Sequence, residues 1–207
     1  MSTAAAVDGN SRTRTRYHSG WMFESLIPFR NKACILFTCL LAFCGLAHAD
    51  RPSEYQVKAA YLYNFGKFVN WPADAGAASE FDVCVLGTDP FGPLLDATVS
   101  DSTINGKRVI ARRIGRAQDA ASCRVVFIAA SESQRLGSDL AVLSKLHVLT
   151  VSDNAHFLER GGMIQFVLEG DRVRFAVNLS AAQEAGLTLS SELLKVATKV
   201  VGNTQVR

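Results

Sequence analysis

The chain has 207 residues, of which 48% are hydrophobic and 20% are charged, a composition that excludes a disordered tail or linker. Its 22 basic residues outnumber the 19 acidic ones, but five basic and two acidic residues precede residue 50, so the remainder carries 17 of each sign. A nucleic-acid-binding domain keeps its basic excess in the folded part. The distribution of charge therefore argues against a nucleic-acid partner.

An N-terminal leader is predicted from the uncharged apolar run at residues 33–47. Arg30 and Lys32 precede this run, and Ala47-His48-Ala49 follows it. A basic flank, a short apolar core and small residues at the two positions that a signal peptidase inspects are typical of a secretory signal peptide. A membrane span would need about 20 apolar residues. We expect cleavage after Ala49.

Two alternatives concern this leader. Met22 is an alternative translation start that gives a leader of more usual length, so that residues 1–21 become an upstream extension. A lipoprotein is the other alternative, because Cys44 follows Leu41-Ala42-Phe43, although a bulky phenylalanine before the cysteine argues against it. With cleavage after Ala49, the remaining residues 50–207 have the size of one domain with a single core.

Cys84 and Cys123 are the two cysteines that follow the leader. In an exported, oxidising setting two such cysteines indicate one disulfide. The alternative is a pair of buried thiols.

The first predicted element of the mature chain is a helix from Ser53 to about Val69. Ser53 stands three residues before Gln56, which is the pattern of a capping box. Asn70-Trp71-Pro72 ends the helix, because the residue before a proline disfavours helical geometry.

Short apolar runs then alternate with helix-sized segments. Strands are predicted at residues 81–86, 107–113, 124–129 and 147–151, and helices at 89–99 and 133–144. Asp89-Pro90 supplies an N-cap and a first-turn proline for the first of these helices. Strands without strict polar alternation, separated by helices, predict a mostly parallel sheet that is covered on both faces.

A β-hairpin is predicted near the C-terminus. Residues 163–168 and 172–178 flank Glu169-Gly170-Asp171, and apolar positions alternate in the second of the two segments. The predicted fold class is therefore α/β: a single domain with a mostly parallel central sheet, flanked by helices on both faces, and a C-terminal β-hairpin.

Two helices are expected after the hairpin. Ser180 and Gln183 form a second capping-box pattern for a short helix that Gly186 stops. The last predicted helix begins at Ser190 and ends near Gly202.

Recognised catalytic and metal-binding motifs are absent after the leader. His147 and His156 have no second metal-type ligand at a recognised spacing, and no G-x-S-x-G nucleophile elbow occurs. The Gly87–Gly92 turn lacks the dinucleotide and phosphate-loop patterns, so it is interpreted as a strand-to-helix turn. We therefore expect no catalytic residue, no metal and no cofactor. Four arginines either receive an anion or form a solvated face: Arg112, Arg113, Arg116 and Arg124.

Lys58 interrupts the apolar face of the first helix. At 100° per residue it lies between the directions of Phe65 and Val69. Because an unpaired buried ammonium is costly, Lys58 must either extend along the apolar surface to water or find a carboxylate or carbonyl partner. The alternative hypothesis is that it fixes the helix against a ligand or partner protein.

Residues 54–65, EYQVKAAYLYNF, continue through Lys67-Phe68-Val69 to Trp71-Pro72. This segment resembles the opening signature of the YfiR-like family, and the resemblance covers nearly all of residues 54–201. Further matching segments are Val85-Leu86-Gly87, Asp89-Pro90-Phe91-Gly92, Gly161-Gly162-Met163-Ile164 with Phe166, Phe175, Asn178, Ala181-Ala182, Gly186-Leu187 and residues 190–197.

The resemblance implies a periplasmic regulator and no enzymatic activity. Such a protein binds the periplasmic sensor domain of an inner-membrane diguanylate cyclase, holds the cyclase inactive, and so lowers cyclic di-GMP and biofilm formation. The resemblance also implies a homodimer. Cys84 and Cys123 resemble one of the two disulfide pairs of the best-known member. The second pair has no counterpart here, so a structural role is expected for the remaining bridge.

Five residues of the opening segment are the candidate partner- or ligand-binding residues: Lys58, Tyr61, Asn64, Phe68 and Trp71. Periodicity alone does not decide which of their aromatic rings are core and which are contacts.

A second hypothesis comes from another class of protein. A periplasmic small-molecule sensor acting on another membrane receptor would use the crevice at the carboxyl ends of the parallel strands, near Gly87–Gly92 and Ala129–Glu132. An enzyme of unknown reaction is the third hypothesis.

Overall fold

The structure is a computed structural model that describes residues 52–72 and 79–202. The described residues belong to one compact unit, Asp50–Arg207. The predicted leader, with Met22, Cys44 and the cleavage site after Ala49, lies outside the described residues.

The first described helix, α2 (Glu54–Phe68), begins as the sequence predicts. The Ser53 hydroxyl oxygen accepts a hydrogen bond from the backbone N–H of Gln56 at 3.2 Å. The Gln56 side-chain oxygen accepts one from the backbone N–H of Ser53 at 2.9 Å. The predicted capping box is therefore confirmed, and α2 ends where Val69 becomes extended.

A central sheet organises the rest of the described chain, and eight of its strands fall within residues 79–202. Across the sheet they are β10 (Lys199–Val201), β8 (Arg172–Asn178), β7 (Ile164–Glu169), β6 (Leu149–Ser152), β5 (Cys123–Ile128), β2 (Glu80–Leu86), β4 (Lys107–Ile114) and β3 (Thr103–Ile104).

The middle of this sheet is parallel. Strands β4, β2, β5, β6 and β7 run in one direction, with chain order 2-1-3-4-5 across the sheet, which is the flavodoxin-like order. β7 and β8 form the predicted antiparallel hairpin, and β10 then pairs in parallel with β8. The predicted fold class is confirmed.

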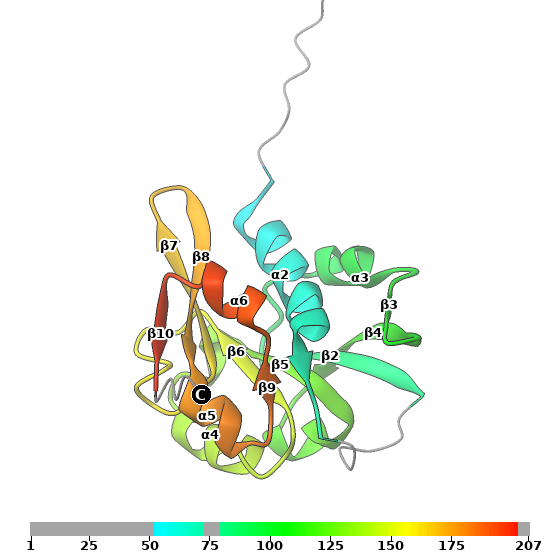
Figure 1. The fold of residues 1–207 in the computed structure, drawn as a ribbon. Helices are drawn as coiled ribbons and strands as arrows, with labels where there is room; N and C mark the ends of the chain where they lie inside the picture. Colours follow the sequence, from blue (N-terminus) through cyan, green and yellow to red (C-terminus); the bar gives the residue numbers. More distant parts are fainter. Residues whose placement is uncertain (1–51, 73–78, 203–207) are drawn as a thin grey trace, which may run out of the picture. The chain divides into compact units, whose positions relative to one another are not determined.

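Helices cover both faces of the sheet, and β2 shows how the sequence achieves this (Figure 1). Val83 and Val85 of β2 join one apolar cluster, whereas Cys84 and Leu86 join the other. The first cluster includes buried residues of α2, α3 (Pro93–Val99), α5 (Leu179–Glu184) and α6 (Ser191–Val196). The second includes residues of α4 (Leu136–Leu143) and the 3-10 helix η1 (Ala117–Ser122).

The predicted disulfide is present between Cys84 of β2 and Cys123 of β5. Both cysteines are buried in the second apolar cluster. The bridge thus joins two neighbouring parallel strands beneath α4 and η1, and the alternative of two buried thiols does not apply.

The predicted start of the second helix at Asp89-Pro90 is wrong. α3 begins at Pro93, after Gly92 has turned the chain with a positive φ of 54°. The Asp89 carboxylate instead accepts a hydrogen bond from the backbone N–H of Phe91 at 2.8 Å. An aspartate that closes such a local turn precedes a helix without capping it.

The predicted cap at Ser180 is also wrong. The N-cap of α5 is Asn178, whose side-chain oxygen accepts from the backbone N–H of Ala181 at 3.2 Å. Ser180 lies inside the helix, and its hydroxyl donates to the same Asn178 oxygen at 3.0 Å.

The last helix is shorter than predicted. α6 follows its predicted cap, Ser190, but ends at Val196, and the segment Lys199–Val201 is strand β10. The backbone N–H of Thr198 bonds to the carbonyl of Phe175 at 2.9 Å. The free edge of β8 therefore pairs with Lys199–Val201, a segment that the sequence had predicted to be helical.

Candidate functional site

Lys58 lies at the centre of a buried ionic network at the N-terminal end of α2. Its side chain is 3% exposed, and its Nζ lies 2.6 Å from Asp153 and 2.5 Å from Glu54. The Tyr55 hydroxyl donates to the same Asp153 carboxylate at 3.3 Å. Nζ also lies over the rings of Tyr55 and Phe166, at 4.6 and 5.8 Å from their centroids. Lys58 thus has the carboxylate partners that its apolar position requires.

The network shifts the pKa values of two of its members. Burial alone would lower the pKa of Lys58, but hydrogen bonds to Asp153 and Glu54 outweigh burial and raise that pKa above its ordinary value. Burial and the charge of Asp153 together raise the pKa of Tyr55. Lys58 therefore stays cationic and Tyr55 neutral at physiological pH, and the network is a stable ionic bridge from α2 to the loop after β6.

An apolar groove runs between α2 and α6. Its volume is about 360 Å³, and buried Phe65 and Phe175 lie at its floor with their ring centroids 5.0 Å apart. Phe68 of α2 and Val196 of α6 line it while remaining 40% and 60% exposed. The described surface thus exposes two large apolar side chains at one place.

A small two-stranded ladder positions the two walls of this groove. β1 (Val69–Asn70) pairs antiparallel with β9 (Thr188–Leu189) directly after α2 and directly before α6. The backbone N–H of Ser190 also bonds to the carbonyl of Phe68 at 2.9 Å. These bonds tie the C-terminal end of α2 to the N-terminal end of α6, side by side in Figure 1.

The groove has an ionised rim. Glu192 lines it, and hydrogen bonds from its own backbone N–H and from the Ser191 hydroxyl lower the pKa of the Glu192 carboxyl group. The groove therefore combines an apolar floor with a negative charge at its edge.

The structure brings three of the five candidate residues together. Tyr61, Asn64 and Phe68 line the groove. Lys58 belongs to the ionic network instead, and Trp71 packs edge-on against Phe81 with centroids 5.3 Å apart. Whether any of the five contacts a partner stays a prediction.

The opposite wall of the groove was missed by sequence analysis. Glu192, Leu193 and Val196 come from α6. The predicted helix did include them, but no local signal indicates that this helix lies against α2. Only the ladder between β1 and β9 decides that.

The arginine cluster is compensated by carboxylates. Arg112 contacts Glu80 and Asp82 at 2.9 and 2.7 Å, and Arg113 contacts Asp89 and Asp96 at 2.9 and 2.6 Å. Arg116 contacts Asp119, and Arg124 is largely buried on β5. These surroundings favour ion pairing within the protein over capture of an anion.

Side chains pack closely at the carboxyl ends of β2 and β5. The Ser131 hydroxyl accepts from the backbone N–H of Thr88 at 2.9 Å, and Gly87 approaches Ser131 so closely that a Cβ there would lie 2.4 Å from its Oγ. Glu132, which is 6% exposed and pairs with Arg135, fills the same region. Whether a small molecule binds near Gly87–Gly92 and Ala129–Glu132 stays a prediction.

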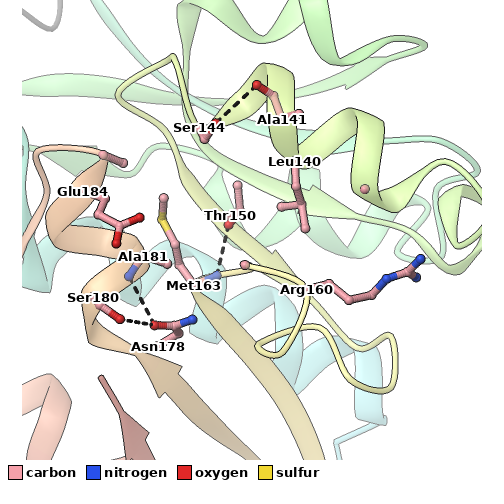
Figure 2. Close-up of a pocket in the computed structure, with 13 residues that line it drawn as sticks. Leu140, Ala141, Ser144, Thr150, Arg160, Met163, Asn178, Ser180, Ala181 and Glu184 are labelled. Carbon is pink, nitrogen blue, oxygen red and sulfur yellow. Dashed lines mark hydrogen bonds between the residues drawn. The ribbon is translucent and has the colours of Figure 1, made fainter. Parts of the chain in front are cut away.

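A separate cavity of about 370 Å³ lies between α4 and α5 (Figure 2). Thr150 and Met163 form its floor, and the Thr150 hydroxyl oxygen accepts from the backbone N–H of Met163 at 3.2 Å. Figure 2 shows Arg160 and Glu184 on opposite sides of this floor. The cavity thus has a mixed lining, with the Thr150 hydroxyl beside the Met163 side chain at its floor.

Membrane and metal features can be judged only for the residues that the structure describes. None of the helices there has the length and apolar character needed to cross a membrane. Within the same residues, no three side chains of His, Cys, Asp or Glu gather in a way that could hold a metal ion.

The strand order and the groove define an α/β protein with a flavodoxin-like sheet and an apolar groove on its surface. Two solved structures are similar in fold. One is a conserved domain protein from Vibrio cholerae, with a TM-score of 0.51 and 10% identity over 72% of this chain and 60% of that one. The other is the ABC domain in complex with L-Trp from Streptococcus pneumoniae, with a TM-score of 0.50 and 10% identity over 69% of this chain and 60% of that one.

This chain spans about 60% of the length of each of those two proteins, and at 10% identity the likeness shows the fold alone. No curated protein matches the sequence significantly. The profile of the YfiR/HmsC-like family matches residues 55–198, and the chain belongs to that family. The YfiR-like family is a periplasmic regulatory family and is not typically catalytic.

Proposed function

We propose that this protein inhibits an inner-membrane diguanylate cyclase by binding the cyclase's periplasmic sensor domain, and so lowers cyclic di-GMP and biofilm formation. Membership of the YfiR/HmsC-like family supports the regulatory role. The apolar groove between α2 and α6 is the observation that carries the binding role.

The groove supports protein binding because of what it exposes. Three large apolar side chains are notably exposed in the described residues, and two of them, Phe68 and Val196, lie on the groove while Leu168 lies on the β7–β8 hairpin. A single exposed apolar residue is ordinary, whereas a pair over an aromatic floor is typical of an interaction site. Because each of these side chains is already partly buried, completing its burial in a complex contributes about half of the roughly 1.5–3 kcal/mol expected for a fully exposed side chain.

The groove also specifies the chemistry of its occupant. The ionised Glu192 at the rim favours a partner segment in which apolar residues stand next to a lysine or arginine. The occupant that we propose is such a segment in the periplasmic domain of the cyclase.

Inhibition by binding requires no catalytic step from this chain. A ligand shifts a conformational equilibrium only by its difference in affinity for the two states. Moving a cyclase from 1:99 to 99:1 in favour of its inactive state takes a difference of about 5.5 kcal/mol. Two apolar anchors that become fully buried only in the inactive state supply roughly 1.5–3 kcal/mol, and other contacts of the interface must supply the rest.

The test is genetic complementation with matched variants. Deleting the gene in cells that express the cyclase raises cyclic di-GMP and surface attachment, and the wild-type gene lowers both again. Phe68→Asp and Val196→Asp each fail to lower them, because a carboxylate replaces an apolar anchor beside Glu192. Leu168→Asp is the control, since it changes an equally exposed apolar residue outside the groove.

Two results contradict the proposal. Unchanged cyclic di-GMP after deletion, with the cyclase present, contradicts inhibition. Full activity of both groove variants, with circular dichroism showing them folded, contradicts the groove as the binding surface. A pull-down from envelope extracts with wild-type and Phe68→Asp protein as bait separates lost binding from lost export.

A further inference from the structure

A polar side chain interrupts the aromatic wall that α2 gives to the apolar groove. Asn64 lines the groove together with Tyr61 and Phe68, and the spacing of the three residues places them on one face of the helix. Within residues 52–72 and 79–202, the half-buried Asn64 carboxamide forms no hydrogen bond. The Tyr61 hydroxyl likewise has no hydrogen-bond partner in the described part of the chain. The aromatic wall therefore carries two polar groups that are available to an occupant.

The Asn64 carboxamide limits what can cover the groove. Its two polar atoms are not fully buried, so water reaches them in the free protein. An occupant that excludes this water has to replace the lost hydrogen bonds, because an unpaired buried amide is costly. A carboxamide needs an acceptor for its NH₂ group and a donor for its oxygen. A purely apolar occupant offers neither.

A bound α-helix does not meet this requirement with its backbone. The N–H and C=O groups of a helix bond to one another along the helix axis. A helix that binds in a groove presents its apolar face to the groove. It would therefore have to place a polar side chain in the middle of that apolar face, opposite Asn64.

An extended segment meets the requirement with a single residue. The backbone N–H and C=O of that residue are unpaired and point to the same side of the chain, so they match the oxygen and the NH₂ group of one carboxamide. Side chains two residues apart lie on the same face of an extended chain, about 7 Å from each other. This spacing suits an apolar side chain over the floor of the groove and a basic side chain at its rim.

We infer that the groove binds its partner segment in an extended conformation, with the Asn64 carboxamide hydrogen-bonded to the backbone N–H and C=O of one partner residue. An apolar side chain of that segment lies over Phe65 and Phe175, and a basic one meets Glu192. The unpartnered carboxamide within the aromatic wall is the observation that carries this inference. The inference rests on the proposed function, in which the groove between α2 and α6 (Figure 1) is the binding surface, and adds the conformation of the bound segment.

Isothermal titration calorimetry with purified protein tests the inference on a model peptide. The probe is an acetylated and amidated pentapeptide with leucine in the middle, lysine at both ends and alanine between them, so that a lysine stands two positions from the leucine in either chain direction. It binds with a dissociation constant below about 1 mM. Three further peptides each carry an N-methyl group on one of the central three residues. At least one of them binds about tenfold more weakly, because it lacks the N–H that donates to Asn64.

Variants assign this loss to Asn64. Asn64→Leu keeps the size of the side chain but weakens binding of the pentapeptide about tenfold, and on this variant the sensitive N-methylated peptide binds as well as the parent peptide. Gln134→Leu is the matched control. It removes an exposed carboxamide just before α4, which packs on the other face of the sheet, and leaves every affinity unchanged. Circular dichroism checks that both variants are folded.

A helical occupant predicts results of the opposite sign. A stapled helical peptide with leucines at positions i, i+3, i+4 and i+7 and a neighbouring lysine binds wild-type protein more weakly than the pentapeptide. If the groove were a site for helices, this peptide would bind more tightly than the pentapeptide, and Asn64→Leu would tighten it further by completing the apolar wall.

The inference is overturned if the pentapeptide gives no binding up to about 10 mM, if all three N-methylated peptides bind as the parent does, if Asn64→Leu leaves its affinity unchanged, or if the stapled helix binds more tightly. The complementation experiment with Phe68→Asp and Val196→Asp reports on the groove whatever the conformation of its occupant. Failure of the extended conformation is therefore distinguishable from failure of the proposed function.

Discussion

Lys58 shows how a single residue constrains the structure around it. A lysine in the middle of an apolar helical face needs a partner for its positive charge, and this requirement can be recognised from the sequence. Its main partner, Asp153, is 95 residues away along the chain and follows β6. The network therefore links the first helix to the carboxyl end of a central strand, and its loss should loosen α2 from the sheet.

Asp153→Asn should lower the free energy of unfolding by about 1–3 kcal/mol, because it leaves the buried Lys58 ammonium with one partner. Glu54→Gln is the matched control. Glu54 is 41% exposed, and an exposed i,i+4 pair contributes less than about 0.5 kcal/mol. Urea denaturation at pH 7 measures both changes. Equal effects of the two substitutions would show that burial does not govern this network.

The raised pKa of Lys58 also predicts a dependence of stability on pH. A lysine whose folded pKa is raised gives its full stabilisation below the pKa of the unfolded chain, about 10.4, and loses it as the pH rises through the folded pKa. Wild-type protein should therefore lose stability relative to Lys58→Met above about pH 10.4. Urea denaturation between pH 8 and 11.5 measures this difference, and parallel curves would contradict it.

At the scale of elements, short strand pairings determine where helices and strands pack, which the local sequence does not predict. The ladder between β1 and β9 places α6 against α2, and the edge of β8 recruits β10. β1, β9 and β10 are strands of two or three residues. Such strands are too short to show the alternation of apolar and polar residues by which a strand is recognised from sequence. The apolar groove between α2 and α6 depends on the pairing of β1 with β9.

The disulfide belongs to this scale because it joins β2 to β5. The loop between Cys84 and Cys123 spans 39 residues, for which loop entropy predicts a stabilisation of about 4 kcal/mol before strain is considered. Replacing both cysteines by alanine should lower the free energy of unfolding by roughly 2–4 kcal/mol in urea denaturation. Thiol titration of the native oxidised protein should find neither cysteine reactive, and two titratable thiols would rule the bridge out.

At the scale of the whole molecule, the predicted leader and the family lead to predictions about export and assembly. Mass spectrometry of the periplasmic protein should give the mass of residues 50–207, with Asp50 at the N-terminus. Ala49→Arg should block this cleavage, because the peptidase requires a small residue there. A protein recovered from the cytoplasm with its leader intact would contradict export.

The family also leads us to expect a homodimer. Light scattering on the processed protein should give twice the mass of one chain, and the mass should not change when Cys84 and Cys123 are both replaced, because their bridge lies within one chain. A monomer over the micromolar range would contradict the dimer.

Much of the architecture was predictable because its signals are local. The capping box at Ser53, the continuous apolar strands and the alternation in the hairpin depend on residues within a few positions of one another. Asp89 and Ser180 were wrongly predicted to be helix caps. A side chain of this type can also close a turn, as Asp89 does, or form a hydrogen bond inside a helix, as Ser180 does. Local pattern does not distinguish these uses.

By itself, the sequence determined the α/β class, the cysteine pair and the need of Lys58 for a partner, since each depends on composition or short-range periodicity. Only the tertiary structure decided that Phe68 meets Val196 across a groove and that Arg160 and Glu184 share a cavity. The reason is physical: these neighbours are far apart along the chain, and their distances are set by strand pairing and helix packing, which no window of a few residues records.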